Sequence, residues 1–245
     1  MTRCIERTSI SEAWAAALEA VLDDADQHVD HLLIRASEPL PEVAEIRAAA
    51  DSLLADLALQ SVDTVRNTIF PYETALDVSD PAGLTEEYLE MYPALKSLGS
   101  PRGTYFGRLI AYPRADGSFG NQLVATIEKL KAAHSGTRWS SIYEINIYNE
   151  QRDTRLTRSF PCMSHLAFHV DDHCVDCLAT YRSHDLVDKA YGNYLGLAQL
   201  QQYVAEQAGF VPGELAVLAG RGFVDIARRH NARLREIAAL AAAPA

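Results

Sequence analysis

Cysteine is scarce in this chain: its 245 residues include four, and three of them fall within residues 159–185. So few and so crowded, they make a poor disulfide framework, and we expect reduced thiols in a reducing, cytoplasmic compartment. The N-terminus lacks the basic, then apolar, then small-residue order of a secretory signal. The chain also lacks the run of roughly 18 apolar residues that a membrane span needs. We therefore expect neither secretion nor a membrane partner.

Basic residues are also few, with 22 Lys and Arg against 33 Asp and Glu and a net charge of −11. A nucleic acid would be repelled by such a chain unless a local basic patch intervened, so a small-molecule ligand is the better expectation. Hydrophobic residues make up 48% of the chain, enough for a buried core. No repeat, low-complexity linker or clear boundary is visible, which predicts a single soluble domain over residues 1–245.

The first 100 residues carry helical patterns. Ser9 and Glu12 form a capping box ahead of apolar residues at helical spacing, which predicts a helix to about Asp26. A second amphipathic pattern covers residues 38–59. The segment 77–103 is rich in turn residues, with a short helix predicted over 85–95.

The second half mixes patterns. Residues 103–120 are interpreted as a short strand that runs into a Pro/Asp/Gly loop, and 121–134 as an amphipathic helix. Residues 140–149 alternate and are rich in β-branched and aromatic side chains, which predicts a strand. The alanine-rich end, 237–245, is interpreted as the last turn of a helix and a frayed tail.

The Cys- and His-rich stretch first suggests zinc, because Cys174 and Cys177 form a C-x-x-C pair with histidines nearby. Alternation along a strand argues against it. One face would carry Cys162, Ser164, Leu166, Phe168 and Val170, and the other Met163, His165, Ala167 and His169. On the returning strand, Cys174 and Cys177 again face opposite sides. We expect no metal, and a zinc-stabilised interaction module stays as a disfavoured alternative.

Four spacings carry a family resemblance. Pro161-Cys162 precedes Arg182-Ser183-His184-Asp185 by 20 positions counted from the cysteine to the arginine, Asn193 follows Arg182 by 11, and Pro212-Gly213 follows Asn193 by 19. This arrangement resembles the thymidylate synthase and pyrimidine-nucleotide hydroxymethylase superfamily, over roughly residues 105–225. The resemblance implies an α+β fold with a mixed β-sheet flanked by helices. The first 100 residues match poorly.

The resemblance also implies roles. Cys162 would add as a thiolate to C6 of a pyrimidine and so activate C5 for methylation or hydroxymethylation with 5,10-methylenetetrahydrofolate. Arg182 and Ser183 would bind the phosphate of a uridylate-like nucleotide, and Asp185 would contact the base or its surroundings. Asn193 would bind the N3–O4 edge of uracil, where an aspartate would favour cytosine. As an N-cap for the helix after it, Asn193 could serve both roles.

A homodimer is implied too, since family members bind the phosphate partly with arginines of the partner subunit. The candidate for that role is Arg138, and the alternatives are Arg152, Arg155 and Arg158.

Several positions depart from the family pattern. Met163 replaces a histidine, Tyr181 a glutamine next to the phosphate-binding arginine, and Lys189 a glycine that helps make room for folate. The sugar-binding H-x-Y becomes Phe223 and Asp225, and Asp225 could accept a sugar hydroxyl.

The family's catalytic glutamate has no firm counterpart. Glu73 lies in the right region, but Pro71 argues against the usual helix there. A catalytically silent nucleotide-binding protein on the same fold is therefore the main alternative to an enzyme.

Overall fold

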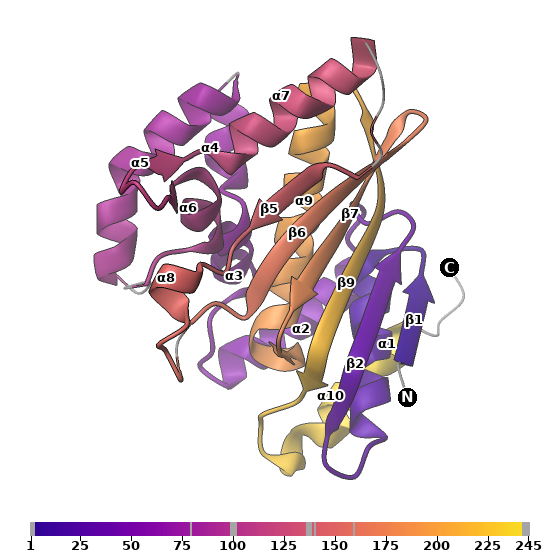
Figure 1. Ribbon diagram of the computed structural model, residues 1–245. Coiled ribbons are helices and arrows are strands. Elements are labelled where there is room, and N and C mark those ends of the chain that lie inside the picture. Colours follow the sequence, from indigo (N-terminus) through magenta and orange to yellow (C-terminus); the bar gives the residue numbers. More distant parts are fainter. Residues whose placement is uncertain are drawn as a thin grey trace.

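A mixed β-sheet forms the centre of the computed structural model, which describes residues 3–78, 80–98, 102–135, 139, 141–158 and 160–241. The main strand order is β1-β2-β9-β7-β6-β5, and β8 also pairs with β9. The strands are β1 (Arg3–Arg7), β2 (His28–Ala36), β5 (Tyr143–Asn146), β6 (Met163–Asp171), β7 (Cys174–Tyr181), β8 (His184–Asp185) and β9 (Val211–Phe223). Pairing is parallel for β1–β2, β7–β9 and β8–β9 and antiparallel for the rest of this sheet. Figure 1 shows the twisted sheet in front of most of the helices.

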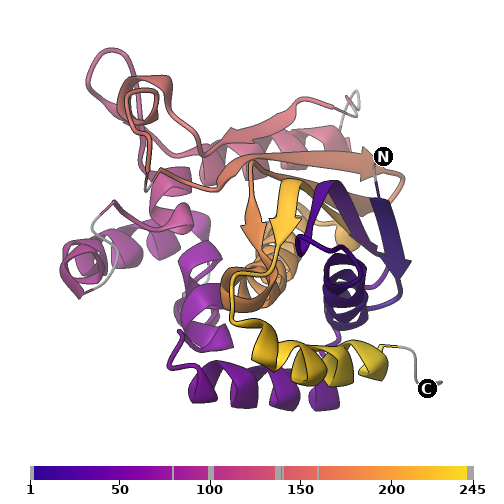
Figure 2. The ribbon, with the colours of Figure 1, turned by 90° about the horizontal axis from the view of Figure 1, so that it is seen from below.

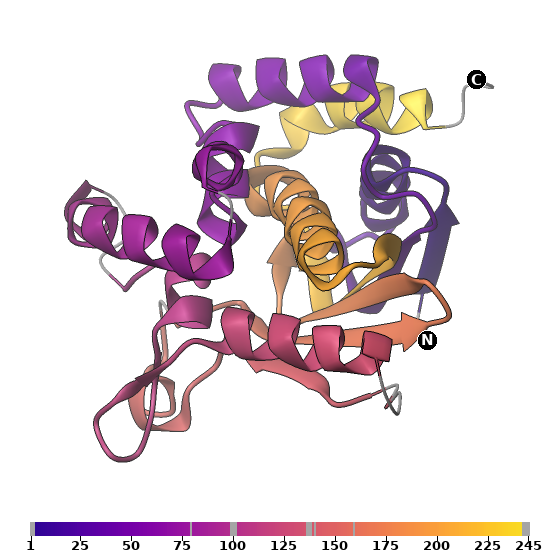
Figure 3. The ribbon, with the colours of Figure 1, turned by 90° about the horizontal axis from the view of Figure 1, so that it is seen from above.

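Two helical layers cover one face of the sheet. The inner layer contains α1 (Ile10–Leu22) and α9 (Tyr191–Ala208), and the outer one α2 (Ala44–Asp56) and α10 (Asn231–Leu240). Figures 2 and 3 show these layers edge-on. The remaining α-helices are α3 (Val62–Ile69), α4 (Tyr72–Asp77), α5 (Pro81–Leu98), α6 (Tyr105–Ile110), α7 (Gln122–Ser135) and α8 (Glu150–Asp153). A small hairpin joins β3 (Tyr112–Pro113) to β4 (Phe119–Gly120), a π-helical turn spans Leu186–Ala190, and a 3₁₀ turn spans Arg228–His230. Among the described residues, no helix combines the length and apolar character needed to cross a bilayer.

The prediction of an α+β fold with a mixed sheet and helices is confirmed. The N-terminal helix is confirmed as α1, where Ser9 and Glu12 form the predicted capping box. The predicted helical character of the first 100 residues is wrong for β1 and β2. In β2, Leu32, Ile34 and Ala36 are buried at period two, because this strand lies inside the sheet between β1 and β9.

Three other local predictions are wrong. Residues 105–110 form helix α6 instead of a strand, because Thr104 caps it by accepting the Gly107 N–H and its apolar residues are buried. Pro71 does not prevent a helix around Glu73; it sits at the N-cap of α4, where a missing N–H costs nothing. The turn-rich segment is mostly α5, which begins at Pro81. The helix at 122–135 and the strand at 143–146 are confirmed.

An irregularity at Ser164 changes the faces of β6. Met163 pairs with Tyr181, but His165 pairs with Thr180, so Ser164 is the extra residue of a β-bulge. Met163 therefore turns into the core with Leu166, and its predicted place beside His165 is wrong. His165, which is partly exposed and lies 2.7 Å from Glu144, stays on the face opposite the buried Leu166, as predicted.

Close packing of α3 on α9 depends on two glycines. A Cβ at Gly192 would lie 2.7 Å from the Val62 carbonyl oxygen, and one at Gly196 would lie 2.7 Å from the Arg66 carbonyl oxygen. Real side chains do not approach so closely, so these positions admit only glycine unless the helices separate. The contact places α3 next to the first turn of α9, where Asn193 lies.

A buried ion pair connects α6 to α8. Arg108 donates two hydrogen bonds to Asp153, at 2.7 and 3.1 Å, and the Asn149 N–H donates to the same carboxylate at 2.9 Å. Both side chains are nearly inaccessible to solvent. Burial alone would raise the pKa of Asp153, but the hydrogen bonds from Arg108 and Asn149 hold it below its ordinary value.

Replacing Arg108 by Met should destabilise the protein by about 3–5 kcal/mol, because Asp153 would keep a buried charge without a partner. Chemical denaturation at neutral pH would measure the change in the free energy of unfolding. The difference should shrink in acid, as the pH falls below the ordinary carboxyl pKa and through the lowered pKa of Asp153.

Arg235→Met is the matched control, because the Arg235–Asp23 pair is half-exposed at 3.0 Å. Exposed pairs contribute about 0–1 kcal/mol. Equal decreases in the free energy of unfolding in the two variants would show that the buried pair contributes no more to stability than the exposed pair.

Candidate active site

A cavity of about 320 Å³ opens between α3, the first turn of α9 and the ends of the β6–β7 hairpin. Ligand sites commonly measure roughly 300–1,000 Å³, so one nucleotide-sized molecule suits this space. Its wall contains Gln60, Val65, Thr68, the segment 102–105, Arg108, the segment 160–162, the segment 183–185, Lys189, Asn193 and Phe223. Four predicted site residues therefore meet in one place: Cys162, Ser183, Asp185 and Asn193.

Cys162 lies directly before β6 and is held by the backbone of the neighbouring strand. Its carbonyl oxygen accepts the Arg182 N–H at 2.9 Å, which continues the hairpin pairing beyond the bulge. The Ser183 hydroxyl donates to its sulfur at 3.9 Å. The Tyr105 hydroxyl accepts the next N–H, that of Met163, at 3.5 Å, and burial raises the pKa of Tyr105 to about 12. The thiol is free and partly accessible, as a nucleophile must be.

Arg182 presents its backbone to Cys162 but directs its side chain elsewhere. The guanidinium lies 4.0 Å over the ring of Phe160 and donates to the carbonyl oxygens of Pro161 and Phe160 at 3.3 and 3.4 Å. The side chain is exposed and borders a groove on the open face of the sheet, beside His31 and Gly220. The Phe160 ring that it covers is part of the cavity wall.

Asn193 is 3% exposed and is the third residue of α9. The predicted N-cap role is wrong, because α9 continues directly from the π-helical turn and Asn193 lies inside it. Its Nδ2 lies 3.0 Å from Nε2 of His184, and its Oδ1 is buried without a partner among the described residues. A buried amide oxygen left unpaired costs free energy, so this atom is a candidate ligand contact.

Asp185 caps the π-helical turn by accepting the N–H groups of Val187 and Asp188 at 2.9 and 3.2 Å. Burial raises the pKa of Asp185; the two backbone hydrogen bonds oppose this rise, and the nearby charges of Asp188 and Asp225 add to it. Asp185 is thus both a structural cap and a carboxyl group on the cavity wall.

Two other predicted contacts lie off the cavity wall. Tyr181 is fully buried and stacks on His184, with ring centroids 3.9 Å apart. Asp225 is exposed beyond β9, whereas Phe223 lines the cavity. Glu73 is exposed on α4 and does not line the cavity either.

Three of the four arginines considered for a partner subunit are described in the structure: Arg152, Arg155 and Arg158 are exposed and do not line the cavity. Arg138 lies outside the described residues.

The sequence did not predict that four further residues line the cavity: His184, Tyr105, Arg108 and Gln60. Lys189 was noted only as the replacement of a glycine that makes room for folate. The Lys189 ammonium donates to Gln60 at 2.7 Å and to Asp188, and thus links two walls of the cavity. Arg102, Arg108 and Lys189 make the wall rich in cations although the chain is acidic. The signal for His184 was its place inside the R-S-H-D motif; Tyr105 and Gln60 have no comparable signal.

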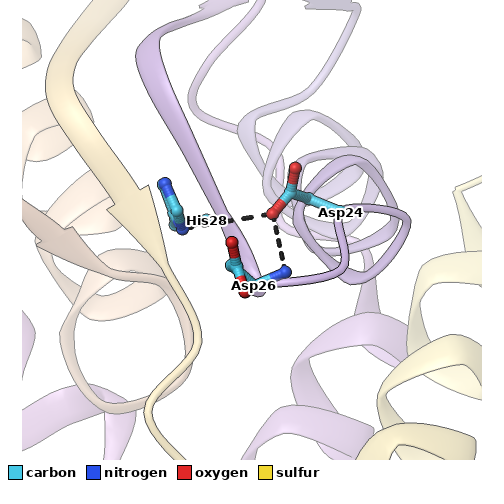
Figure 4. Close-up of side chains that lie close together, drawn as sticks. All are labelled: Asp24, Asp26 and His28. Atoms are coloured by element: carbon cyan, nitrogen blue, oxygen red, sulfur yellow. Dashed lines mark hydrogen bonds and ion pairs between the residues drawn. The ribbon is translucent and has the colours of Figure 1, made fainter.

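The Cys/His stretch disperses its metal-ligating groups. Cys177 is buried, and burial raises the pKa of its thiol, while Cys174 is partly exposed. A cluster of three possible metal ligands does occur among the described residues, but outside this stretch. It consists of Asp24, Asp26 and His28, at the connection from α1 to β2, and their ligand atoms lie within 4.8 Å of one another. Figure 4 shows Asp24 accepting the Asp26 N–H and facing His28, at 2.9 and 4.0 Å. Such an exposed acidic turn needs no ion.

Comparison with known proteins identifies the family of this chain. The sequence profile described as thymidylate synthase matches residues 86–238. A protein of Methanothermobacter marburgensis named "Putative thymidylate synthase" is 24% identical over 221 residues, covering 85% of this chain and 86% of its own. One of Methanothermobacter thermautotrophicus with the same name is 24% identical over 230 residues, covering 89% and 90%. A third, from Methanosarcina mazei, is 31% identical over 99 residues, covering 40% and 43%. Because the profile covers more than half of it, the chain belongs to the thymidylate synthase family.

Proposed function

We propose that this protein methylates or hydroxymethylates C5 of a uridylate-like nucleotide through a covalent bond between Cys162 and C6. One observation carries the proposal: a partly accessible thiol, the Ser183 hydroxyl and the unpartnered amide oxygen of Asn193 belong to one cavity of nucleotide size. Family membership supports the same class of reaction. The members named above are remote in sequence, so the substrate is inferred here from the cavity.

The chemistry needs a nucleophile that can add and later leave. Pyrimidine C5 does not react with an electrophile until the Cys162 thiolate adds to C6, which moves the C5–C6 electron pair toward C5 and O4. After the one-carbon unit has bonded to C5, C5 loses its proton and the bond between the transferred carbon and its donor breaks. The transferred carbon would then take up a hydride to end as methyl, which the folate would supply while ending as dihydrofolate, or a hydroxide from water to end as hydroxymethyl. The thiolate then leaves, and the C5–C6 double bond returns. A thiolate suits both steps because it is a good nucleophile and a good leaving group.

Asn193 would hold the base. Its Oδ1 can accept the N3–H of uracil, and the second hydrogen on Nδ2 can donate to O4 while the first points at His184. Binding would then satisfy the buried oxygen. The aromatic rings of Phe160 and Phe223 provide apolar wall for a flat heterocycle.

The phosphate would bind near Arg182 and Ser183, which flank Cys162. Arg182 is exposed next to the cavity residue Ser183, and its guanidinium would exchange its hydrogen bonds to the Phe160 and Pro161 carbonyl oxygens for a bidentate contact with the phosphate. Arg102 and Lys189 on the cavity wall add positive charge, which attracts an anionic ligand to an otherwise acidic protein.

A folate would need space beside the nucleotide, because the cavity of about 320 Å³ suits one nucleotide-sized molecule. Lys189 and Arg102 match the carboxylates of folates, and the ring of Phe223 offers a surface for a flat heterocycle. These three residues would hold 5,10-methylenetetrahydrofolate, which supplies the one-carbon unit when bound. The Lys189–Gln60 contact, 2.7 Å long, would separate as it enters.

A silent nucleotide-binding protein is the competing function, and one observation favours it. Among the described residues of the cavity wall, the carboxyl group is that of Asp185, and it is engaged in capping, while Glu73 lies outside. A protein without a proton relay could still bind a nucleotide through Arg182, Ser183 and Asn193. Enzyme and binder differ in whether Cys162 becomes covalently attached.

Incubation with 5-fluorouridylate or its deoxy form plus methylenetetrahydrofolate should give a covalent adduct on Cys162. Fluorine at C5 cannot leave as a proton does, so the reaction should stall after carbon transfer. Intact mass measured under denaturing conditions would show the added nucleotide and carbon donor. We expect the ribonucleotide to react better, because Phe223 and Asp225 replace the family's sugar-binding pair.

Cys162→Ser should abolish the adduct, and Cys174→Ser, which removes a partly exposed thiol away from the cavity, should leave it unchanged. Measurable binding of the unmodified nucleotide with no adduct from either analogue would reject the transferase and support the silent binder.

Arg182→Ala should weaken nucleotide binding by about 2–5 kcal/mol, because the phosphate would lose a charged bidentate partner. Calorimetric titration with uridylate and with uridine would measure the effect, which should be large only for the phosphorylated ligand. Arg235→Ala on the distant helix α10 is the control. An unchanged affinity for uridylate in the Arg182 variant would remove Arg182 from the site.

The proposed assembly is a homodimer that pairs through the open face of the sheet. Figure 1 shows this face uncovered over β2, β9, β7 and β6. Its accessible apolar residues are Leu33, Ala167, Leu178, Ala216 and Leu218. Such a patch is typical of a protein interface. Arg182 borders the same face, so a partner subunit would approach the phosphate site.

Leu178→Glu should convert the dimer to a monomer, because a charge would be buried between two sheets. Leu178 is 39% exposed, and Leu76→Glu, at a 64% exposed position on α4, should leave the dimer intact. Light scattering after size-exclusion chromatography would report the mass. A wild-type monomer at all concentrations, or a dimer that survives Leu178→Glu, would contradict this interface.

A further inference from the structure

His184, inside the R-S-H-D motif, is a buried imidazole that the reaction itself does not use. It is 2% exposed and lies between two aromatic rings, stacked on Tyr181 at 3.9 Å and 13° and edge-on to Tyr194 at 5.1 Å. Its Nε2 lies 3.0 Å from Nδ2 of Asn193, and its Nδ1 has no partner among the described residues. The rings on two sides prevent it from turning.

The side-chain amide of Asn193 can bind a pyrimidine base in two opposite orientations. A half-turn of its amide exchanges Oδ1 and Nδ2 with almost no change of shape. With Oδ1 opposite N3 and Nδ2 opposite position 4, the amide complements uracil, which has N3–H and O4. After the half-turn it complements cytosine, which has a bare N3 and an amino group at C4. Whatever holds the amide in one orientation therefore selects the base.

His184 can hold it. Burial lowers the pKa of His184 to about 3, so the ring is neutral at physiological pH and has one bare nitrogen. In the observed arrangement Nδ2 of Asn193 lies 3.0 Å from Nε2, and it donates a hydrogen bond there when the His184 proton is on Nδ1 and Nε2 is bare. In that tautomer, a half-turn of the amide would place Oδ1 against the Nε2 lone pair and lose the hydrogen bond.

We propose that His184 is the positioning residue for base specificity: by accepting a hydrogen bond from Asn193 it fixes the amide for uracil and against cytosine. This inference rests on the proposed function, because it assumes that Asn193 binds a pyrimidine. His184 touches no substrate in this account and acts only through Asn193.

The ratio of the affinities for uridylate and cytidylate tests it. Wild type should prefer uridylate, and His184→Phe, which keeps a flat ring but removes the acceptor, should reduce the preference by about tenfold. Tyr194→Phe, which removes a buried hydroxyl beside His184 and keeps its edge contact, should leave the ratio unchanged. If His184 served only in packing, His184→Phe would weaken the binding of both nucleotides equally and leave the ratio of their affinities unchanged. That result would overturn the proposal.

If His184→Phe does not fold, a measurement on the wild-type protein tests the same proposal. Long-range ¹H–¹⁵N spectra of protein labelled with ¹⁵N-histidine, in the presence of uridylate, report which nitrogen of His184 carries the proton. We expect Nδ1–H; a proton on Nε2 would overturn the proposal. If neither nucleotide binds wild type, the proposed function fails as well, whereas binding of uridylate with an unchanged ratio in the variant rejects only the role of His184.

Discussion

The bulge at Ser164 is the constraint on which the site depends. An extra residue in β6 turns Met163 into the core opposite Tyr181, and the pairing then resumes between the Cys162 carbonyl and the Arg182 N–H. This backbone bond places the ends of two strands together, so Cys162 and Ser183 become neighbours although 20 residues separate them. The ends of two strands, which move little compared with loops, thus hold the proposed nucleophile.

Helix packing sets the opposite wall. Gly192 and Gly196 let α3 approach α9 until a single added carbon would overlap the α3 backbone. That approach places Val65 and Thr68 of α3 across the cavity from the hairpin, and it buries the Asn193 amide oxygen with no partner in the described part of the chain. Burying an unpaired amide oxygen costs free energy, and a base bound as proposed would remove that cost, which links packing to binding.

The spacings in the sequence predicted which candidate residues lie together, whereas periodicity assigned some local elements wrongly, and the reason is physical. Residues at fixed spacings around strand ends, such as Cys162, Ser183 and Asn193, must come together once the hairpin and α9 form. The alternation of residue types along β6 does not reveal the bulge, so the face of the sheet on which Met163 lies could not be predicted. Residues 105–110 are short and apolar, a pattern that fits a strand or a helix, and only the Thr104 cap separates the two. The direction of the Arg182 side chain depends on Phe160, a tertiary contact.

The buried residues behind the site form a continuous series of contacts. Met163, where a family histidine is absent, packs opposite Tyr181; Tyr181 stacks on His184; His184 holds Asn193. Neither Met163 nor Tyr181 presents a polar group to the cavity, so the polar partner of Asn193 in this protein comes from the motif position between Ser183 and Asp185. The departures from the family pattern at residues 163 and 181 are therefore compatible with the proposed recognition of the base by Asn193. The side chain that contacts the Asn193 amide is His184, in the layer behind the cavity wall. Its low exposure keeps the imidazole neutral, so that one ring nitrogen can accept a hydrogen bond.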